Sequence, residues 1–337
     1  MSQTQESSHF PLGAFIFLFT GPIFSWSIQP LFIRWFADYY DPWTQNAFRY
    51  SVAAVAVLGL GYYRGILRFR IPREWWVAIA FVVIANVAQQ TFLAWKYEFI
   101  YPSVAILVAR LDILFICVIS FLVFPDERSI IRSPRFIFGA LLALFGIVVV
   151  LLGRDPEILQ HLEVGKLTFW IGVILAVFYA LSCASYSVSI KRAMWHMDPL
   201  LCFIHVSWIS SLIFILCGLV LGDLSDVWTS RPEGEPSLWT DPVTWMFVTG
   251  ITSIAIAHPF LYAALRRIKT VVYVTLMMMA PFITCSLSAW IYGDRLTGVQ
   301  IIGGLAAITG AWLAALAQAR LARRKRAQGL ALGEASQ

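Results

Sequence analysis

The most constraining feature of the sequence is a pair of long apolar runs near its C-terminus, at 271–292 and 299–312. A short polar turn at 293–297 separates them. At 1.5 Å per residue, a helix made from either run spans, or nearly spans, the roughly 30 Å hydrocarbon core of a bilayer. The two runs therefore predict a transmembrane helical hairpin.

The same pattern occurs once earlier in the chain. An apolar run at 104–124 is followed by an acidic-Arg turn at 126–128 and by a return run at 136–153. Each return run carries two glycines seven residues apart: Gly139 and Gly146 in the first, Gly303 and Gly310 in the second. That spacing places a pair on one helical face, where another helix backbone can approach closely. Glycine is common in transmembrane helices, but its recurrence beside the same turn favours an internal repeat.

Composition extends the membrane interpretation to the whole chain. Hydrophobic residues make up 59% of it and charged residues 13%, with a mean hydropathy of +0.75, whereas soluble domains have roughly 25% charged residues. We expect an all-α, multi-pass protein of the cell (inner) membrane. Ten apolar runs of near-spanning length are predicted: 12–36, 43–63, 74–95, 102–124, 136–153, 168–190, 199–221, 242–265, 270–292 and 298–319.

The distribution of Lys and Arg predicts the orientation of these helices. With both termini in the cytoplasm, the inside segments hold the basic clusters at 64–73, 128–135, 191–192, 266–269 and 320–326, as the positive-inside rule requires. Five helices per half is an odd number, so the second half enters the membrane from the opposite side. We therefore predict a first repeat at 12–153, a second at 168–319 and a basic cytoplasmic tail at 320–337.

The C-terminal hairpin carries a motif that resembles a known family. A helix with Pro281 is followed twelve residues later by the turn Gly293, Asp294, Arg295 and then by a glycine-containing helix. This resembles the EamA-type branch of the drug/metabolite transporter superfamily, where Glu is usual in place of Asp294. The first copy departs from the pattern, with Ile113 where the proline would fall. FSWSIQPLFIRW and FRYSVAA resemble the family's first and second helices, and the resemblance covers nearly the whole chain.

This resemblance implies ten helices arranged as two inverted five-helix EamA repeats. It also implies a substrate cavity between the halves, lined by helices 1 to 4 and 6 to 9, with helices 5 and 10 at the periphery. Such proteins move small metabolites without an ATPase domain. The resemblance leaves the substrate open, because relatives handle amino acids, nucleotide precursors, sugars and drugs.

Two charged residues, Arg110 and Asp112, lie deep in the predicted helix 102–124. Each such charge needs a partner or a wet cavity, because it costs about 2.5–3.5 kcal/mol on insertion scales. On a continuous helix the two are about 200° apart. We therefore expect Asp112 to pair with Arg49 of the second helix, which leaves Arg110 to bind a substrate anion. The alternatives are a structural Arg110 and a proton-carrying Asp112.

Polar and aromatic side chains suited to a cavity gather on three helices. They are Trp26 and Gln29 in the first, Asn86 and Gln90 in the third, and Tyr179 and Tyr186 in the sixth. Rings, hydroxyls and amides together suit an organic metabolite, and Tyr186 is roughly the repeat equivalent of Trp26. The alternative is that these polar faces join helices to one another.

The deep histidines are His205 in the seventh predicted helix and His258 in the eighth. We assign His258 to substrate binding and His205 to a structural or coupling role, because imidazole titrates near neutral pH. The alternative is a neutral histidine bonded to a neighbouring helix. No metal-ligand spacing surrounds either, and we predict neither metal nor cofactor. Pro30, Pro259 and Pro281 mark candidate hinges.

These features favour a secondary active transporter that moves a small organic metabolite, an amino acid or related compound, out of the cell by alternating access. The expected partners are the substrate and the lipid bilayer. Nucleic acid is excluded, because the basic residues serve orientation. The alternatives are multidrug or lipophilic-cation efflux and a non-transporting membrane subunit. A membrane-embedded enzyme fits less well, because HExxH and GxSxG motifs are missing and one acid lies deep.

Overall fold

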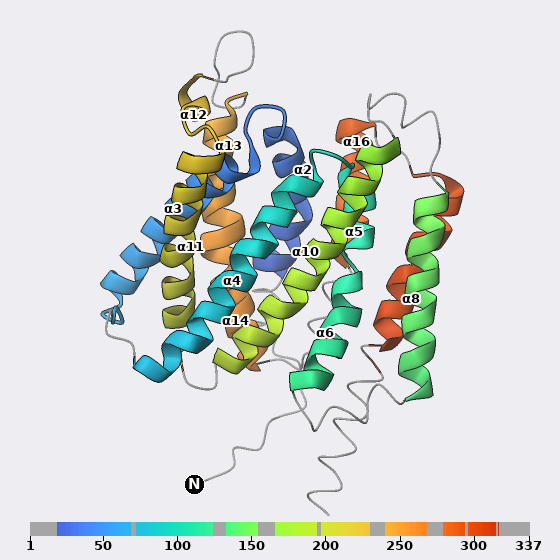
Figure 1. The fold of residues 1–337 in the computed structure, drawn as a ribbon, viewed down its shortest axis with the longest axis horizontal. Helices are drawn as coiled ribbons and strands as arrows, with labels where there is room; N and C mark the ends of the chain where they lie inside the picture. Colours follow the sequence, from blue (N-terminus) through green and yellow to red (C-terminus); the bar gives the residue numbers. More distant parts are fainter. Residues whose placement is uncertain are drawn as a thin grey trace, which may run out of the picture.

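The computed structural model describes residues 19–68, 72–123, 133–153, 166–193, 197–229, 240–267, 279–293, 296–314 and 316, and within them it contains helices and turns but no strand (Figure 1). The first half contains η1 (Phe19–Ile23), α2 (Phe24–Phe36), α3 (Pro42–Tyr63), α4 (Arg73–Lys96), α5 (Pro102–Val108), α6 (Leu111–Val123) and α8 (Pro134–Leu152). The second half contains α10 (Lys166–Ala193), α11 (Pro199–Leu221), α12 (Asp226–Thr229), α13 (Pro242–Thr249), η3 (Gly250–Ile256), α14 (Ala257–Arg267), α16 (Met279–Tyr292) and a last helix, Gly298–Ala314.

Not every apolar run is one straight helix. In the described part of the chain, four helical segments are long and apolar enough to cross a membrane: Trp75–Lys96, Leu167–Ile190, Pro199–Leu221 and Pro242–Tyr262. The last of these runs without a gap through α13, η3 and α14, whereas the predicted helix 102–124 is divided into α5 and α6. Residues 270–278 and the turn residues 294–295 lie outside the described ranges. The count of ten spanning helices stays a prediction.

The second helix of each predicted repeat, α3 or α11, begins with the same Asp-Pro signal. The Asp41 carboxylate accepts hydrogen bonds from the backbone N–H of Trp43 at 2.8 Å, and Asp198 accepts one from Leu200 at 3.0 Å. The following proline suits this position because it has no N–H to satisfy and a φ already fixed for a helix. The two helices pack against each other. The same signal begins α13, where the Asp241 carboxylate accepts from the Thr244 N–H at 3.1 Å, so it marks helix starts in general.

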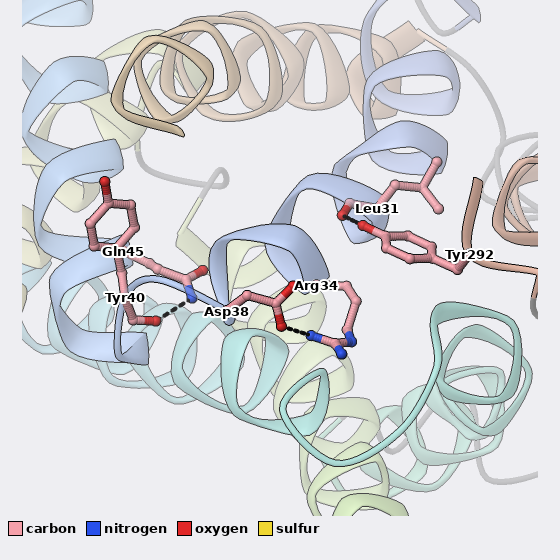
Figure 2. Close-up of polar contacts among 6 residues, drawn as sticks. All are labelled: Leu31, Arg34, Asp38, Tyr40, Gln45 and Tyr292. Atoms are coloured by element: carbon pink, nitrogen blue, oxygen red, sulfur yellow. Dashed lines mark hydrogen bonds and ion pairs between the residues drawn. The ribbon is translucent and has the colours of Figure 1, made fainter. Parts of the chain in front are cut away.

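Helices of the two halves pack directly against each other. The most extensive helix pairs are α4 with α10 and α3 with α11, and each combines a helix of the first half with one of the second. A further pair is α2 with α16, where Thr284 Oγ1 donates to the Ser27 carbonyl at 2.8 Å and the Tyr292 hydroxyl donates to the Leu31 carbonyl at 2.6 Å. Figure 2 shows the second of these contacts.

The chain that follows α2 is held by its own local contacts. Arg34 forms an exposed ion pair with Asp38 at 2.6 Å, and Gln45 Nε2 donates to the Tyr40 carbonyl at 2.9 Å (Figure 2). The Gln45 contact is buried, and it gives the Tyr40 carbonyl a side-chain partner away from water. These bonds fix the connection between α2 and α3.

The glycines of the two return runs pack against each other. α8 and the last helix lie side by side at one edge of the molecule (Figure 1). A Cβ added to Gly146 would lie 2.3 Å from the Ala307 nitrogen, and one added to Gly310 would lie 2.3 Å from the Ala143 nitrogen. The predicted close approach of another helix backbone is confirmed.

The pairing of these glycines is also self-complementary. Gly139 meets Gly310, and Gly146 meets Gly303, so the two helices run antiparallel. If the first copy is exchanged for the second, Gly139 becomes Gly303 and Gly146 becomes Gly310, and each contact turns into the other. A twofold axis between two equivalent helices produces such a pair of exchangeable contacts.

Large apolar side chains cover much of the outer surface. Leu167 is 76% exposed, Val220 79% and Trp290 81%, and each lies on a different helix. A water-soluble monomer rarely exposes apolar surface to this extent. These outward faces are therefore suited to lipid.

Candidate substrate site

An aromatic group surrounds His258 where helices of both halves meet. The His258 ring stacks on Phe203 of α11 with centroids 5.1 Å apart, and it forms T-shaped pairs with Trp26 of α2 and Tyr186 of α10, with centroids 5.3 and 6.2 Å apart. Tyr186 and Tyr262 share a hydrogen bond at 2.6 Å between their hydroxyls. We call Trp26, Tyr186, Phe203, His258 and Tyr262 the His258 cluster. It unites three residues that the sequence predicted for substrate binding: Trp26, Tyr186 and His258.

The π-helical segment η3 shapes one wall of this cluster. Trp26 Nε1 donates to the Ser253 carbonyl of η3 at 3.0 Å, and Ser25 Oγ donates to Ser253 Oγ at 2.9 Å. π-Helical turns widen the backbone locally and are frequent at functional sites. Pro259 follows three residues after η3 and lacks an N–H to donate, while α14 continues through it. Among the predicted hinges, Pro259 lies beside a segment of irregular helix in the described residues.

Asn86 joins three helices through its side-chain amide. Asn86 Oδ1 accepts a hydrogen bond from the Tyr50 hydroxyl of α3 at 3.0 Å, and Asn86 Nδ2 donates to Ser210 Oγ of α11 at 3.0 Å. Both ends of this buried amide therefore have protein partners. The arrangement fits the alternative role in joining helices.

The two glutamines of the predicted site have unsatisfied amides. Gln90 is buried on α4, and its carbonyl oxygen Oε1 has no hydrogen-bond partner among the described residues. Gln29 is buried on α2, and its Nε2 likewise has none. Buried polar atoms are normally paired. Both amides therefore remain candidates for contact with a substrate.

The fourth predicted transmembrane segment breaks at its charged residues. α5 ends at Val108 and α6 begins at Leu111, and the N–H of Arg110 bonds to the Leu107 carbonyl, three residues back, at 3.1 Å. Because this turn is tighter than an α-helix, the 200° separation does not apply. Arg110 NH2 lies 3.7 Å from Asp112 Oδ2.

The charge pairing that we expected from a continuous helix is therefore wrong. Asp112 pairs with Arg110 and not with Arg49. Arg49 is 0% exposed on α3, and none of its three side-chain nitrogens has a hydrogen-bond partner among the residues that the structure describes. Within that part of the chain, the guanidinium of Arg49 is a buried charge with no counter-ion.

Lys96 is a buried cation that sequence reasoning missed. This last residue of α4 is 1% exposed, and its Nζ lies 3.4 Å from the ring centroid of Tyr179 and 4.8 Å from that of Tyr97. The charges of Arg110 and Asp112 are near enough to act on it. The predicted site residue Tyr179 therefore provides an aromatic face for a cation. In the sequence, a lysine at a predicted helix end looks like one whose ammonium group reaches the membrane surface. Nothing in the sequence therefore indicated that Lys96 is buried.

His205 has a partner for each ring nitrogen. Nδ1 accepts a hydrogen bond from Trp208 Nε1 at 3.1 Å, and Nε2 lies 2.9 Å from the Arg68 carbonyl. Since Nδ1 accepts, Nε2 carries the proton and donates to that carbonyl. A neutral imidazole uses one donor and one acceptor in this way, so the geometry fits the structural alternative. In the described part of the chain, no group of three or more His, Cys, Asp or Glu could hold a metal ion.

Glu98 is a titratable group in the turn that follows α4. Burial and the neighbouring Asp41 carboxylate raise the pKa of Glu98 to about 7, against the opposing effect of Arg34. An acid with a raised folded-state pKa contributes stability that is complete below its unfolded pKa and is lost as pH rises through about 7. We expect the unfolding temperature of the wild-type protein to fall between pH 5 and pH 8 by more than that of Glu98→Gln, as measured by thermal unfolding in detergent. Equal pH profiles would contradict this assignment.

Comparison with known proteins agrees with this architecture. A model of the EamA-like transporter family matches residues 13–152 and 170–316. One solved crystal structure is similar in fold, with a TM-score of 0.61 and 22% identity, over 92% of this chain and 99% of its own. A search of curated proteins gave no match. The chain is a multi-pass membrane transporter of the drug/metabolite transporter superfamily and belongs to the EamA-like transporter family.

Proposed function

We propose that the protein is a secondary active transporter that exports a small organic metabolite, an amino acid or related compound, across the cytoplasmic membrane. The observation that carries the proposal is the His258 cluster. Trp26 comes from the first matched segment, and the other four residues come from the second. Aromatic rings, hydroxyls and an imidazole at the junction of two repeats are suited to an organic molecule.

The proposed mechanism is alternating access by two inverted five-helix repeats, with ten helices in all and both termini in the cytoplasm. The halves contact each other through α3 with α11 and α4 with α10, so a rocking movement between them changes access to residues at that junction. The irregular segment η3 supports such a movement because its backbone hydrogen bonding is not uniform. Tyr179, Gln29 and Gln90 are proposed as further substrate contacts, whereas the pairing of Arg110 with Asp112 fits its structural alternative.

The second candidate function is efflux of lipophilic cations. Aromatic faces bind quaternary ammonium groups, and the His258 cluster presents several. The two candidates differ in the charge of the compound that binds.

A ligand screen with a matched pair of tryptophan variants tests both functions. We expect one class of amino acids, organic acids, sugar phosphates, nucleosides or lipophilic cations to raise the unfolding temperature of the purified protein, since a ligand at 100 times its Kd stabilises by about 2.7 kcal/mol. Trp26→Ala should lose this response and transport in proteoliposomes. Trp290→Ala removes an 81% exposed tryptophan and should keep both. A response that survives Trp26→Ala unchanged would refute the site, and stabilisation by cations alone would favour efflux.

A further inference from the structure

Arg49 differs from the other deep cations of the described helices in how its charge is compensated. Lys96 lies against the rings of Tyr97 and Tyr179, and Arg110 lies 3.7 Å from the Asp112 carboxylate. Arg49 is fully buried, yet its Nε, NH1 and NH2 have no hydrogen-bond partner within the described residues. A buried guanidinium without acceptors is strongly unfavourable, so a site of this kind calls for an acceptor from elsewhere.

The surroundings of Arg49 place it beside the proposed site. α3 packs against η3, and a Cβ added to Gly250 would lie 2.8 Å from the Arg49 carbonyl oxygen. The glycine at 250 therefore allows η3 to approach α3 at Arg49. Three residues further along η3, the Ser253 carbonyl accepts the hydrogen bond from Trp26 Nε1 of the His258 cluster. Arg49 is thus close to the His258 cluster, which contains mainly uncharged aromatic side chains.

Within the described residues, no side chain or backbone carbonyl accepts a hydrogen bond from the Arg49 guanidinium. The adjacent Tyr50 hydroxyl is engaged with Asn86 Oδ1. A guanidinium offers a planar set of donors that matches the two oxygens of a carboxylate or the oxygens of a phosphate. The side chain best suited to hold an oxyanion here is therefore Arg49 and not Arg110.

We propose that Arg49 is the residue that anchors the substrate, by binding a carboxylate or phosphate group of an organic anion whose apolar part lies against the His258 cluster. This inference rests on the proposed function and adds the substrate class to it. It reverses the roles that the sequence suggested for the two arginines. Arg110 then has a local role with Asp112.

Four compounds that share a phenyl body test this proposal: phenylacetate, phenyl phosphate, the neutral phenylacetamide and the cationic phenethylammonium. We expect at least one of the two anions, but neither the amide nor the amine, to raise the unfolding temperature of the full-length wild-type protein in detergent. If phenylacetate raises the unfolding temperature, the substrate carries a carboxylate; if phenyl phosphate raises it, the substrate carries a phosphate. In Arg49→Gln the Kd of the responding anion should rise about 10- to 100-fold, as for loss of a hydrogen bond to a charged group. Arg49→Lys, which keeps the charge but not the planar donors, should retain part of the affinity.

A matched control is Arg34→Gln, which removes one positive charge at an exposed ion pair and should leave the anion response unchanged. Without ligand, Arg49→Gln should unfold at the wild-type temperature or above it, because it removes a buried charge that has no partner in the described part of the chain. A purely structural Arg49 would instead give a lower temperature and an unaltered anion Kd, and that result overturns the proposal. It is equally overturned if the amide binds as tightly as the anions, or if neither anion stabilises the wild type. If Trp26→Ala lost the anion response and Arg49→Gln kept it, the proposed substrate site at the His258 cluster would stand. Only the anchoring role of Arg49 would then be refuted.

Discussion

Gly146→Leu is expected to separate α8 from the last helix and to destabilise the protein by about 3 kcal/mol, at the upper end for overpacked side chains. The reason is geometric. Even a Cβ at this position would lie 2.3 Å from the Ala307 nitrogen and 2.5 Å from the Gly303 oxygen. Both atoms belong to the facing backbone, so they cannot turn away as a flexible side chain would. Thermal unfolding of the purified protein in detergent measures the effect.

Gly59→Leu is the matched control for this change. Gly59 is exposed on α3, and a Cβ added there would meet no heavy atom within 4 Å, so the variant should unfold within a few degrees of the wild type. Gly310→Leu should cost as much as Gly146→Leu, since its Cβ would lie 2.3 Å from the Ala143 nitrogen. The double variant should cost less than the sum, because either leucine already separates the helices. If Gly146→Leu and Gly59→Leu were equally stable, the close backbone contact would be refuted.

Asp112→Asn should destabilise the protein by about 3 kcal/mol, the loss typical of removing one partner of a buried ion pair. Asp112 lies 3.7 Å from Arg110, and their side chains are 17% and 12% exposed. Lys96 is close enough to be affected by both charges. Removal of the carboxylate therefore leaves two cations near each other, with no compensating charge from Asp112. Chemical or thermal unfolding in detergent, together with transport in proteoliposomes, measures the result.

Asp38→Asn provides the comparison, because it breaks an ion pair of 2.6 Å whose Asp38 side chain is 51% exposed. Exposed pairs contribute about 0–1 kcal/mol, so this variant should remain near wild-type stability. The double variant Arg110→Met/Asp112→Leu should recover most of the stability lost in Asp112→Asn, since it removes both charges. A stable Asp112→Asn protein that no longer transports would contradict the structural role and favour proton coupling through Asp112.

The sequence predicted well those features that depend on local pattern. The seven-residue spacing of Gly139 and Gly146, and of Gly303 and Gly310, indicated a face open to another backbone, and these two faces pack against each other. Helical periodicity determines which residues share a face whatever the fold. The Asp-Pro signals at Asp41, Asp198 and Asp241 were equally visible in the sequence and would have located three helix starts.

The pairing of the charges could not be predicted in the same way. The angle between Arg110 and Asp112 was calculated for a continuous helix, but the helix breaks at Ala109 and Arg110. Lys96 directly follows the predicted helix 74–95, as a residue at the membrane surface would, yet its Nζ lies 3.4 Å from the ring centroid of Tyr179. In both cases the partner of the charged side chain depends on how the chain packs around it. The residues next to it in the sequence do not determine that packing.

The sequence by itself determined that this is a helical membrane transporter of the EamA-like family with an internal repeat. Apolar run length, charge distribution and glycine spacing are properties of neighbouring residues, and the bilayer imposes them on any chain that crosses it. Only the tertiary structure decided that Arg110 has a carboxylate partner, that Asn86 joins three helices, and that Arg49 is left without an acceptor in the described residues. The physical reason is that compensation of a buried polar group depends on atoms from other helices within a few ångströms, and packing alone brings those atoms together.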